Sequence, residues 1–185
     1  INGRKTILVT GGSGFIGSHT CCILLEKGYK LLVIDSLVNS SETALENVKK
    51  ILNNKYLEIS HMIEFYKLDL RNKDNLEEVF AKARSENNNI DAVIHFAALK
   101  SVSESLSKPL EYWNVNLLGT INLLENMKKF NCKVIVFSSS ASIYGIPKNK
   151  FILEDDLINP LSPYGETKVA IEKLLSNIYS SSYEW

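Results

Sequence analysis

The sequence predicts an α/β fold, a doubly wound parallel sheet flanked by helices. Short apolar runs alternate with helical patterns along the chain, a glycine-rich turn joins the first run to the first helix, and polar motifs follow the runs. Apolar runs that lack polar alternation are typical of strands buried on both faces of a parallel sheet. Regular alternation of such strands with helices favours right-handed crossovers within one sheet.

Five apolar runs rich in Val, Ile, Leu and Phe are expected to form the strands. They cover residues 5–10, 31–35, 63–68, 92–96 and 133–138. In open sheets of this kind the ligand lies outside the carboxyl ends of the strands, where the strand order reverses. The motifs that follow the runs are therefore expected to meet at one edge of the sheet.

Five helical segments follow the runs in turn. They cover residues 15–27, 42–53, 75–84, 109–130 and 163 to about 179. Gly28 is expected to end the first helix in a left-handed conformation, and Pro109 and Pro163 suit a first helical turn. Residues 147–163 lack periodicity, which predicts a long loop over the site.

Length and composition describe one sizeable domain. The chain has 185 residues, of which 45% are hydrophobic and 23% are charged, as is usual for a soluble globular protein. Acidic and basic residues cancel at 21 each, which argues against nucleic acid or an anionic membrane as the main partner. No apolar stretch approaches the roughly 20 residues that a membrane span requires.

The cysteines indicate a reducing compartment. Cys21, Cys22 and Cys132 lie inside apolar patterns without metal-ligand spacing, so we expect buried thiols and a cytoplasmic protein. The sequence begins at Ile1, and a removed targeting segment stays open. His19, His61 and His95 also lack metal-ligand spacing, and no metal is expected.

Residues 11–17, here called the glycine turn, read Gly-Gly-Ser-Gly-Phe-Ile-Gly and stand between a strand and a helix. Such a turn holds a phosphate, because the first N–H groups of a helix lack partners and carry the positive end of its dipole. Gly11 is expected to permit the tight turn, Gly14 a close approach to a pyrophosphate, and Gly17 the packing of helix on sheet. A purely structural turn is the alternative.

Two aspartates end strands in positions suited to a dinucleotide. Asp35 follows Gly17 by 18 residues, about the distance at which dinucleotide folds place a carboxylate on the adenosine ribose. A carboxylate accepts from both ribose hydroxyls and repels a 2′-phosphate, which favours NAD over NADP. Asp69 is placed to accept from the adenine amino group. For both residues the alternative is a carboxylate that only caps a turn.

Tyr164 and Lys168 are the catalytic candidates with the most specific spacing. Residues i and i+4 share one face of a helix, so both side chains are expected to point into the site. A neighbouring ammonium favours the phenolate form of a tyrosine, which can then take a proton from an alcohol. Tyr144 and Lys148 have the same spacing, but Gly145 and the proline at 147 argue against a helix there.

The run of serines after the fifth strand offers a further candidate. Ser140 is our choice for a hydroxyl that bonds both a substrate hydroxyl and the tyrosine oxygen. The alternative is a serine-rich turn that satisfies strand-end amides. The run lacks the G-x-S-x-G pattern of nucleophilic serines.

Several motifs together resemble the UDP-glucose 4-epimerase family of extended short-chain dehydrogenases/reductases. The resemblance runs in order from about residue 5 to the end of the chain, through residues 10–20, 35–40, 96–105, 137–145 and 162–168. The resemblance implies a Rossmann-like fold and bound NAD. It also implies that the backbone of Phe15 and Ile16 holds the pyrophosphate and that Asp35, Asn39 and Ser40 contact the adenosine ribose and its phosphate.

The remaining roles implied by the resemblance concern the active site. Asp69 is expected to hold adenine, Lys100 to reach the cofactor's ribose and phosphate, and Asn116 to lie near the site. Ser140, Tyr164 and Lys168 would form the catalytic set. Tyr164 and Lys168 would also bind the cofactor, with Lys168 holding the nicotinamide ribose. The implied reaction inverts carbon 4 of UDP-glucose and UDP-galactose through a transient 4-keto sugar, with the hydride held on NAD.

Three other functions stay open. Related sugar-nucleotide 4,6-dehydratases carry an acid pair after the fifth strand, where this chain has Ser140 and Ala141. A non-catalytic dinucleotide sensor could keep the fold, although the presence of Ser140, Tyr164 and Lys168 weighs against it. The chain could also serve only as an interaction module. Whether N-acetylated UDP-hexoses are accepted is open as well.

The family pattern also sets expectations about domains and assembly. Residues 1–185 are expected to form an NAD-binding domain that lacks a final strand and a smaller carboxyl-terminal substrate domain. These residues alone are expected to bind NAD weakly, to have negligible epimerase activity and to leave an apolar sheet edge uncovered. A homodimer is expected through two helices of each subunit, residues 109–130 and 163–179.

Overall fold

The predicted parallel sheet is present in the computed structural model, which describes residues 4–53, 60–147 and 150–181. Its five strands lie in the order β3-β2-β1-β4-β5 and pair in parallel throughout. They are β1 (Thr6–Thr10), β2 (Lys30–Asp35), β3 (Ile63–Lys67), β4 (Ile90–His95) and β5 (Ile135–Phe137). The strand order reverses between β1 and β4, which puts the carboxyl ends of these two strands at the switch point.

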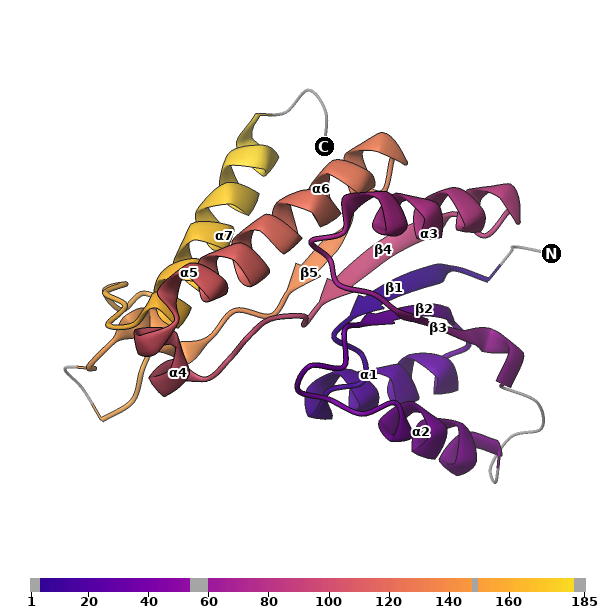
Figure 1. Ribbon diagram of the computed structural model, residues 1–185, viewed down its shortest axis with the longest axis horizontal. Coiled ribbons are helices and arrows are strands. Elements are labelled where there is room, and N and C mark those ends of the chain that lie inside the picture. Colours follow the sequence, from indigo (N-terminus) through magenta and orange to yellow (C-terminus); the bar gives the residue numbers. More distant parts are fainter. Residues whose placement is uncertain (1–3, 54–59, 148–149, 182–185) are drawn as a thin grey trace.

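Helices cover both faces of the sheet, as Figure 1 shows. They are α1 (Phe15–Glu26), α2 (Thr43–Asn53), α3 (Lys73–Ser85), α4 (Val102–Ser107), α5 (Pro109–Tyr112), α6 (Gly119–Lys129) and α7 (Pro163–Ser180). Helices α1 and α2 lie on one face, and α3, α6 and α7 lie on the other. Successive residues of β1 divide between the faces: Ile7 and Val9 pack toward α1, and Leu8 packs toward α6. Both sides of the central strands are therefore buried, as the continuous apolar runs predict.

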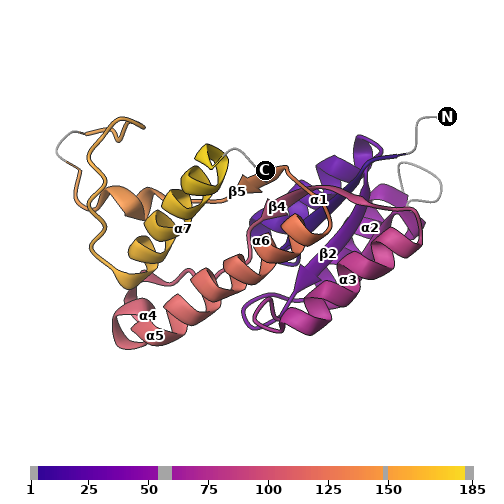
Figure 2. The ribbon, with the colours of Figure 1, turned by 90° about the horizontal axis from the view of Figure 1, so that it is seen from above.

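The segment expected as one helix over 109–130 follows a continuous helical path but is not uniform. Between α5 and α6 the turns widen into a π-helix, η2 (Trp113–Leu118). This irregularity matters because Asn116, which is 1% exposed, lies within it. Figure 2 shows that α4, α5 and the start of α7 extend beyond the sheet, beside the carboxyl ends of the strands.

Other expected boundaries agree with the structure within a few residues. Gly28 has φ +85° and follows α1, and Pro109 and Pro163 begin α5 and α7. The Ser162 side chain caps α7 by accepting from the N–H of Gly165 at 3.1 Å. The described residues of the long loop after Gly145 contain no helix or strand before α7.

Two short elements differ from expectation. Helix α4 was not predicted, and β5 has 3 residues where the apolar run is 6 residues long. Among the described strands β5 forms one edge of the sheet, and Val136 on it is 57% exposed.

Candidate active site

A cavity of about 500 Å³ opens at the carboxyl ends of the strands, where the polar motifs were expected to meet. Its walls come from the glycine turn and from the loops after β2, β3, β4 and β5, together with helix α7. The candidate residues that line it are Gly11, Gly14, Phe15, Ile16, Gly17, Asp35, Asn39, Ser40, Asp69, Lys100, Tyr164 and Lys168. Two other candidates, Ser140 and Asn116, are not among its lining residues.

The glycine turn is held by very close backbone contacts. Gly11 has φ +70°, and a Cβ there would lie 2.6 Å from the backbone nitrogen of Ala97 in the loop after β4. A Cβ on Gly17 would lie 2.3 Å from the carbonyl oxygen of Gly11, so this glycine packs α1 on the turn itself. Gly12 is the glycine of this turn that lies against the neighbouring strand β2, because a Cβ there would lie 2.5 Å from the Val33 side chain. Its role was not predicted.

The amino end of α1 faces the cavity with its first N–H groups uncapped by a side chain. Gly14 is the N-cap residue and has no side chain to accept from them. Phe15 and Ile16 line the cavity and are 77% and 60% exposed. Ser13 adds a buried hydroxyl that has no hydrogen-bond partner among the described residues. This end of the helix can therefore bind an anion.

Asp35 joins the glycine turn to the loop after β2. One carboxylate oxygen accepts from the N–H of Ser13 at 3.0 Å, and the other accepts from the N–H of Leu37 at 2.9 Å and from the hydroxyl of Ser40 at 2.7 Å. Leu37 itself has φ +60°, a conformation that is unusual for a branched side chain. A carboxylate has about four acceptor positions, so Asp35 can still accept from a ligand hydroxyl.

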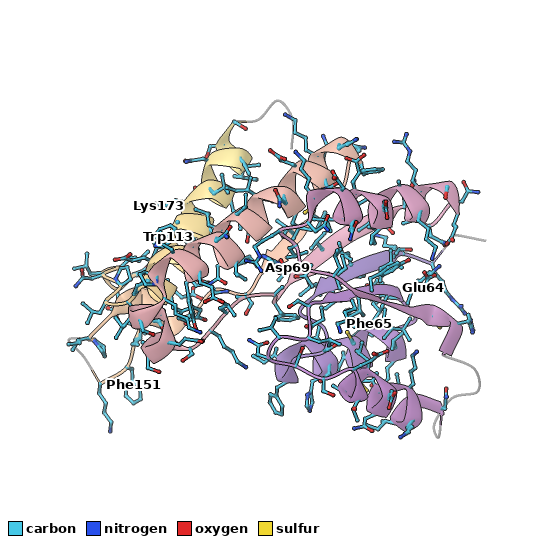
Figure 3. All side chains as sticks on the ribbon, in the orientation of Figure 1. Glu64, Phe65, Asp69, Trp113, Phe151 and Lys173 are labelled. Atoms are coloured by element: carbon cyan, nitrogen blue, oxygen red, sulfur yellow. The ribbon has the colours of Figure 1, made fainter. Side chains whose placement is uncertain are left out.

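Asp69 lies near the centre of the molecule, where the loop after β3 meets the other polar loops (Figure 3). Its carboxylate binds the guanidinium of Arg71, with a shortest distance of 2.6 Å. The hydrogen bonds from Arg71 lower the pKa of Asp69. Arg71 also lines the cavity, and the sequence reasoning missed it. The signal in the sequence was that Arg71 stands two residues after Asp69, close enough to pair with its carboxylate.

Tyr164 and Lys168 share one face of α7 and line the same cavity, as their spacing predicts. The ammonium of Lys168 lies 5.8 Å from the centre of the Tyr164 ring. Tyr164 is 8% exposed, and the edge of its ring packs against Tyr112 at 6.4 Å between centroids. The described residues offer its hydroxyl no hydrogen bond, which leaves that group available to a ligand.

The Lys168 ammonium is buried close to the Tyr164 ring. It donates to the carbonyl oxygen of Ser138 at 2.8 Å and lies 4.7 Å from the ring centre of Phe137. Burial lowers the pKa of Lys168 to about 8. At pH 7 the ammonium form therefore still predominates by about ten to one.

Ser140 and Asn116 lie next to the cavity and are engaged with the protein. The Ser140 oxygen caps the 3-10 helix η3 (Ala141–Tyr144) by accepting from the N–H of Ser142 at 3.2 Å. The side chain of Asn116 accepts from the N–H of Leu99 at 2.8 Å and donates to the Leu99 carbonyl at 3.0 Å. Asn116 also donates to the hydroxyl of Thr167 on α7 at 3.1 Å. It therefore fixes the loop after β4 against the helix that carries Tyr164.

In the second tyrosine–lysine pattern, the described residues that follow Tyr144 are not helical. Tyr144 is the last residue of η3, and Gly145 follows it with φ +64°. Lys148 lies outside the described residues. The hydroxyl of Tyr144 donates to the Glu154 carbonyl at 3.5 Å, within the long loop.

The sequence reasoning also missed Ser139, a cavity residue whose buried hydroxyl has no partner among the described residues. The serine run was the signal, but nothing in it distinguishes Ser139 from Ser140. The described part of the chain places no three His, Cys, Asp or Glu side chains where they could hold a metal ion. Across the same residues, no helix is both long and apolar enough to cross a membrane.

Residues 8–185 match the protein family described as GDP-mannose 4,6 dehydratase. The chain belongs to this family. A UDP-glucose 4-epimerase of Cyamopsis tetragonoloba is 46% identical over 181 residues, which are 98% of this chain and 49% of the relative. The UDP-glucose 4-epimerase of Bacillus subtilis is 46% identical over 179 residues, or 97% of this chain and 49% of the relative.

Solved structures agree with these family relationships. A UDP-glucose 4-epimerase from Bifidobacterium longum, in complex with NAD+ and UDP, matches with a TM-score of 0.86 and 44% identity. The match covers 98% of this chain and 51% of that one. The chain thus spans about half the length of the curated relatives it matches. The fold class and the family resemblance expected from the motifs are confirmed.

Proposed function

We propose that this chain forms the cofactor-binding and proton-transfer part of an enzyme that inverts carbon 4 of UDP-glucose and UDP-galactose. One observation carries the proposal: Tyr164 and Lys168 line the same cavity as the glycine turn, with the ammonium 5.8 Å from the phenol ring. The epimerase relatives, at 46% identity over nearly all of this chain, support it.

NAD is the cofactor that fits this cavity. The uncapped amino end of α1 suits a pyrophosphate, and the buried hydroxyls of Ser13 and Ser139 lack partners among the described residues. Asp35 would hold the adenosine ribose, and its negative charge favours NAD over NADP. When bound, NAD supplies a reversible hydride acceptor. The relative from Bifidobacterium longum was crystallised with NAD+.

The other proposed contacts divide between the two ends of the dinucleotide. Asn39, Ser40 and Asp69 would face the adenosine half, and Arg71 would keep the Asp69 carboxylate ionised as a hydrogen-bond acceptor. Lys100 would reach the ribose and phosphate from the loop after β4. Asn116 would act indirectly, because its side chain holds the backbone of Leu99 beside the cavity.

Tyr164 would take the proton from the 4-hydroxyl of the hexose. Lys168 supports this step, since a nearby ammonium favours the phenolate and its own pKa of about 8 keeps it charged near neutral pH. Ser140 would steady the oxygen at carbon 4. Its oxygen accepts from the N–H of Ser142, so its proton remains available for donation to the sugar.

An epimerase fits this site better than a dehydratase, although the matched family bears a dehydratase description. Dehydration needs a general acid beside the sugar, and residues 138–142 read Ser-Ser-Ser-Ala-Ser. Three carboxylates line the cavity, and each has a partner in the protein. Asp35 accepts from backbone N–H groups, Asp69 binds Arg71, and Glu111 lies 3.9 Å from the ammonium of Lys108. This segment therefore supports inversion without loss of water.

A homodimer belongs to the proposal. Helices α5 and α7 pack beside each other and carry exposed apolar side chains, among them Leu110 at 84% and Tyr179 at 85% exposure. Two such helix pairs could bury these faces against each other. Light scattering over a range of protein concentrations should give twice the subunit mass. A monomer at every concentration would contradict this arrangement.

The cytoplasm is the compartment that the proposal implies. None of the three cysteines, all of which lie in described parts of the chain, forms a disulfide. Burial raises the pKa of the Cys21 thiol to about 12 and that of Cys132 to about 11, so both stay protonated and unreactive. Unreactive buried thiols suit a reducing compartment.

The direct test is to add UDP-galactose to the complete protein and follow both the sugar and the cofactor. The proposal predicts conversion to UDP-glucose, with a small transient absorbance of reduced nicotinamide and no net consumption of NAD. A dinucleotide sensor would bind NAD and leave the sugar unchanged. A dehydratase would release water and accumulate a keto-deoxy sugar, and either result would contradict the proposal.

A further inference from the structure

His95 is a buried residue that the proposed chemistry does not use. It is the last residue of β4, and it is 1% exposed. Its Nδ1 lies 2.6 Å from the hydroxyl of Thr10 at the end of β1, and its Nε2 lies 2.8 Å from the hydroxyl of Thr120 on α6. The ring therefore bridges the central strands and the helix that follows η2.

The hydrogen bonds around His95 determine where its proton lies. Thr120 donates its single hydroxyl proton to the carbonyl oxygen of Asn116 at 2.6 Å, so it must accept at His95. Nε2 therefore carries the ring proton. The N–H of Ala97 donates to the Thr10 oxygen at 3.4 Å, which leaves the Thr10 proton for Nδ1. All donors along this chain point the same way, from Ala97 to Asn116.

A neutral ring fits both this pattern and the burial of His95, which is 1% exposed. An imidazolium would donate from both nitrogens and would reverse the bond with Thr10. The ring centre of Phe137 lies 5.7 Å from that of His95. The ammonium of Lys168 lies 4.7 Å from the same Phe137 ring centre, so Lys168 is close to His95 as well. Burial, together with the Lys168 charge, lowers the pKa of His95 to about 3. His95 therefore adds no positive charge near the lysine.

The far end of the network reaches the helix that carries the tyrosine. Asn116 binds the backbone of Leu99 and donates to the Thr167 hydroxyl, and Thr167 donates to the carbonyl oxygen of Tyr164 at 2.7 Å. One hydrogen-bonded path thus runs from the end of β1 through His95 and η2 to the first turn of α7.

We propose that His95 is a positioning residue for the Tyr164–Lys168 pair, acting as a neutral ring protonated at Nε2 that ties the ends of β1 and β4 to η2 and, through Asn116, to α7. The inference rests on the proposed function, because that function gives Tyr164 and Lys168 their roles in the reaction. The tautomer and the path of hydrogen bonds do not depend on that function.

The first test reads the tautomer directly in the complete protein. Long-range ¹H–¹⁵N correlation of ¹⁵N-histidine protein, with His95 assigned by its absence in His95→Gln, should give a neutral ring protonated at Nε2. The signal should stay unchanged between about pH 5 and about pH 9, since burial keeps the ring neutral. An Nδ1-protonated ring, or a ring that titrates in this range, would overturn the proposal.

The second test separates positioning from mere folding. Gln can accept from Thr10 and donate to Thr120 in the same direction as neutral His, whereas Phe can do neither. His95→Phe is expected to lower kcat at least about tenfold with the KM for UDP-galactose within about threefold, because misplacement of the reacting groups acts on the chemical step. His95→Gln should recover most of the rate.

The exposed His61 provides the matched control, and His61→Phe should behave as wild type. A wild-type kcat in His95→Phe, or an equal loss in His95→Phe and His95→Gln, would overturn the positioning role. Should His95→Phe fail to fold, the tautomer and the rate of His95→Gln decide the matter. If the wild-type protein is active but its His95 ring is not protonated at Nε2, only this inference is overturned. If the wild-type protein is inactive but its His95 ring is protonated at Nε2, the proposed function is overturned.

Discussion

Lys168 donates a hydrogen bond of 2.8 Å to the carbonyl oxygen of Ser138, the first residue after β5. The lysine is 3% exposed, so this bond holds a buried ammonium at the end of the sheet. Because Ser138 is fixed by the strand and Lys168 by α7, the charge has one position relative to the phenol of Tyr164. The cost of burying the charge appears as a lowered pKa, about 8.

Replacing Lys168 with Met is expected to remove a pH dependence from the stability of the protein. The pKa of this lysine falls from 10.5 to about 8 on folding, so between these values the unfolded chain binds more protons. The free energy of unfolding of the wild type should therefore rise with pH over this window, by up to about 3 kcal/mol.

Urea denaturation at about pH 7 and about pH 10 measures this difference, and Lys168→Met should show a smaller rise than the wild type. The exposed Lys173 offers a control, since Lys173→Met should keep the wild-type rise. The same rise in wild type and Lys168→Met would contradict the buried charge.

Gly17→Ala and Gly28→Ala should differ strongly in their effect. A Cβ at Gly17 would lie 2.3 Å from the Gly11 carbonyl oxygen, so α1 must shift away from the turn that would hold the pyrophosphate. At Gly28 nothing lies within 4 Å of a Cβ, and only the φ of +85° opposes alanine, at a cost of about 1 kcal/mol.

Denaturation and NAD titration of both variants check this expectation. Gly17→Ala should lose at least about tenfold in NAD affinity, because a shifted helix no longer presents its N–H groups, whereas Gly28→Ala should keep it. An unchanged NAD affinity in Gly17→Ala would show that the turn does not hold the cofactor.

The sequence predicted the sheet well because the central strands β1 and β2 are buried on both faces, and such burial leaves continuous apolar runs. It failed for α4, a short helix whose stability depends on one cap. The Ser101 side chain accepts from the N–H of Glu104, and this Ser-x-x-Glu pattern was present but too short to stand out. The π-helix at Trp113–Leu118 had no local signal.

The candidate site was predictable where local spacing fixes geometry. Tyr164 and Lys168 share a helix face, and the glycine turn follows from its three glycines. Asn116 was named, but its bonds to Leu99 and Thr167 join segments distant in the sequence, which no local pattern can reveal. The donor and acceptor roles in the hydrogen bonds through His95 likewise depend on residues of four separate elements, so no local sequence pattern could predict them.

Asp35→Asn is expected to weaken NAD binding at least about tenfold. The substitution would disturb hydrogen bonds within the protein as well as the contact with the adenosine ribose. Both carboxylate oxygens accept hydrogen bonds, from the N–H of Ser13 and of Leu37. Asparagine has one acceptor oxygen, so its amide group would face one of these donors, and an unmade bond of this kind costs about 1–3 kcal/mol. Calorimetric titration with NAD measures the loss.

Asp155→Asn, at an exposed carboxylate that does not line the cavity, should bind NAD as the wild type does. Affinity within about twofold of wild type in Asp35→Asn would mean that this carboxylate does not organise the cofactor site.

The rate at which Tyr164→Phe converts UDP-galactose to UDP-glucose, measured in the complete protein, tests the central claim most directly. The Tyr164 hydroxyl has no hydrogen-bond partner among the described residues, so its removal should leave stability and NAD content unchanged. Loss of the general base should lower kcat by about 10²–10⁴-fold, while Tyr144→Phe keeps the wild-type rate. A Tyr164→Phe enzyme that holds NAD and turns over at the wild-type rate would contradict the account.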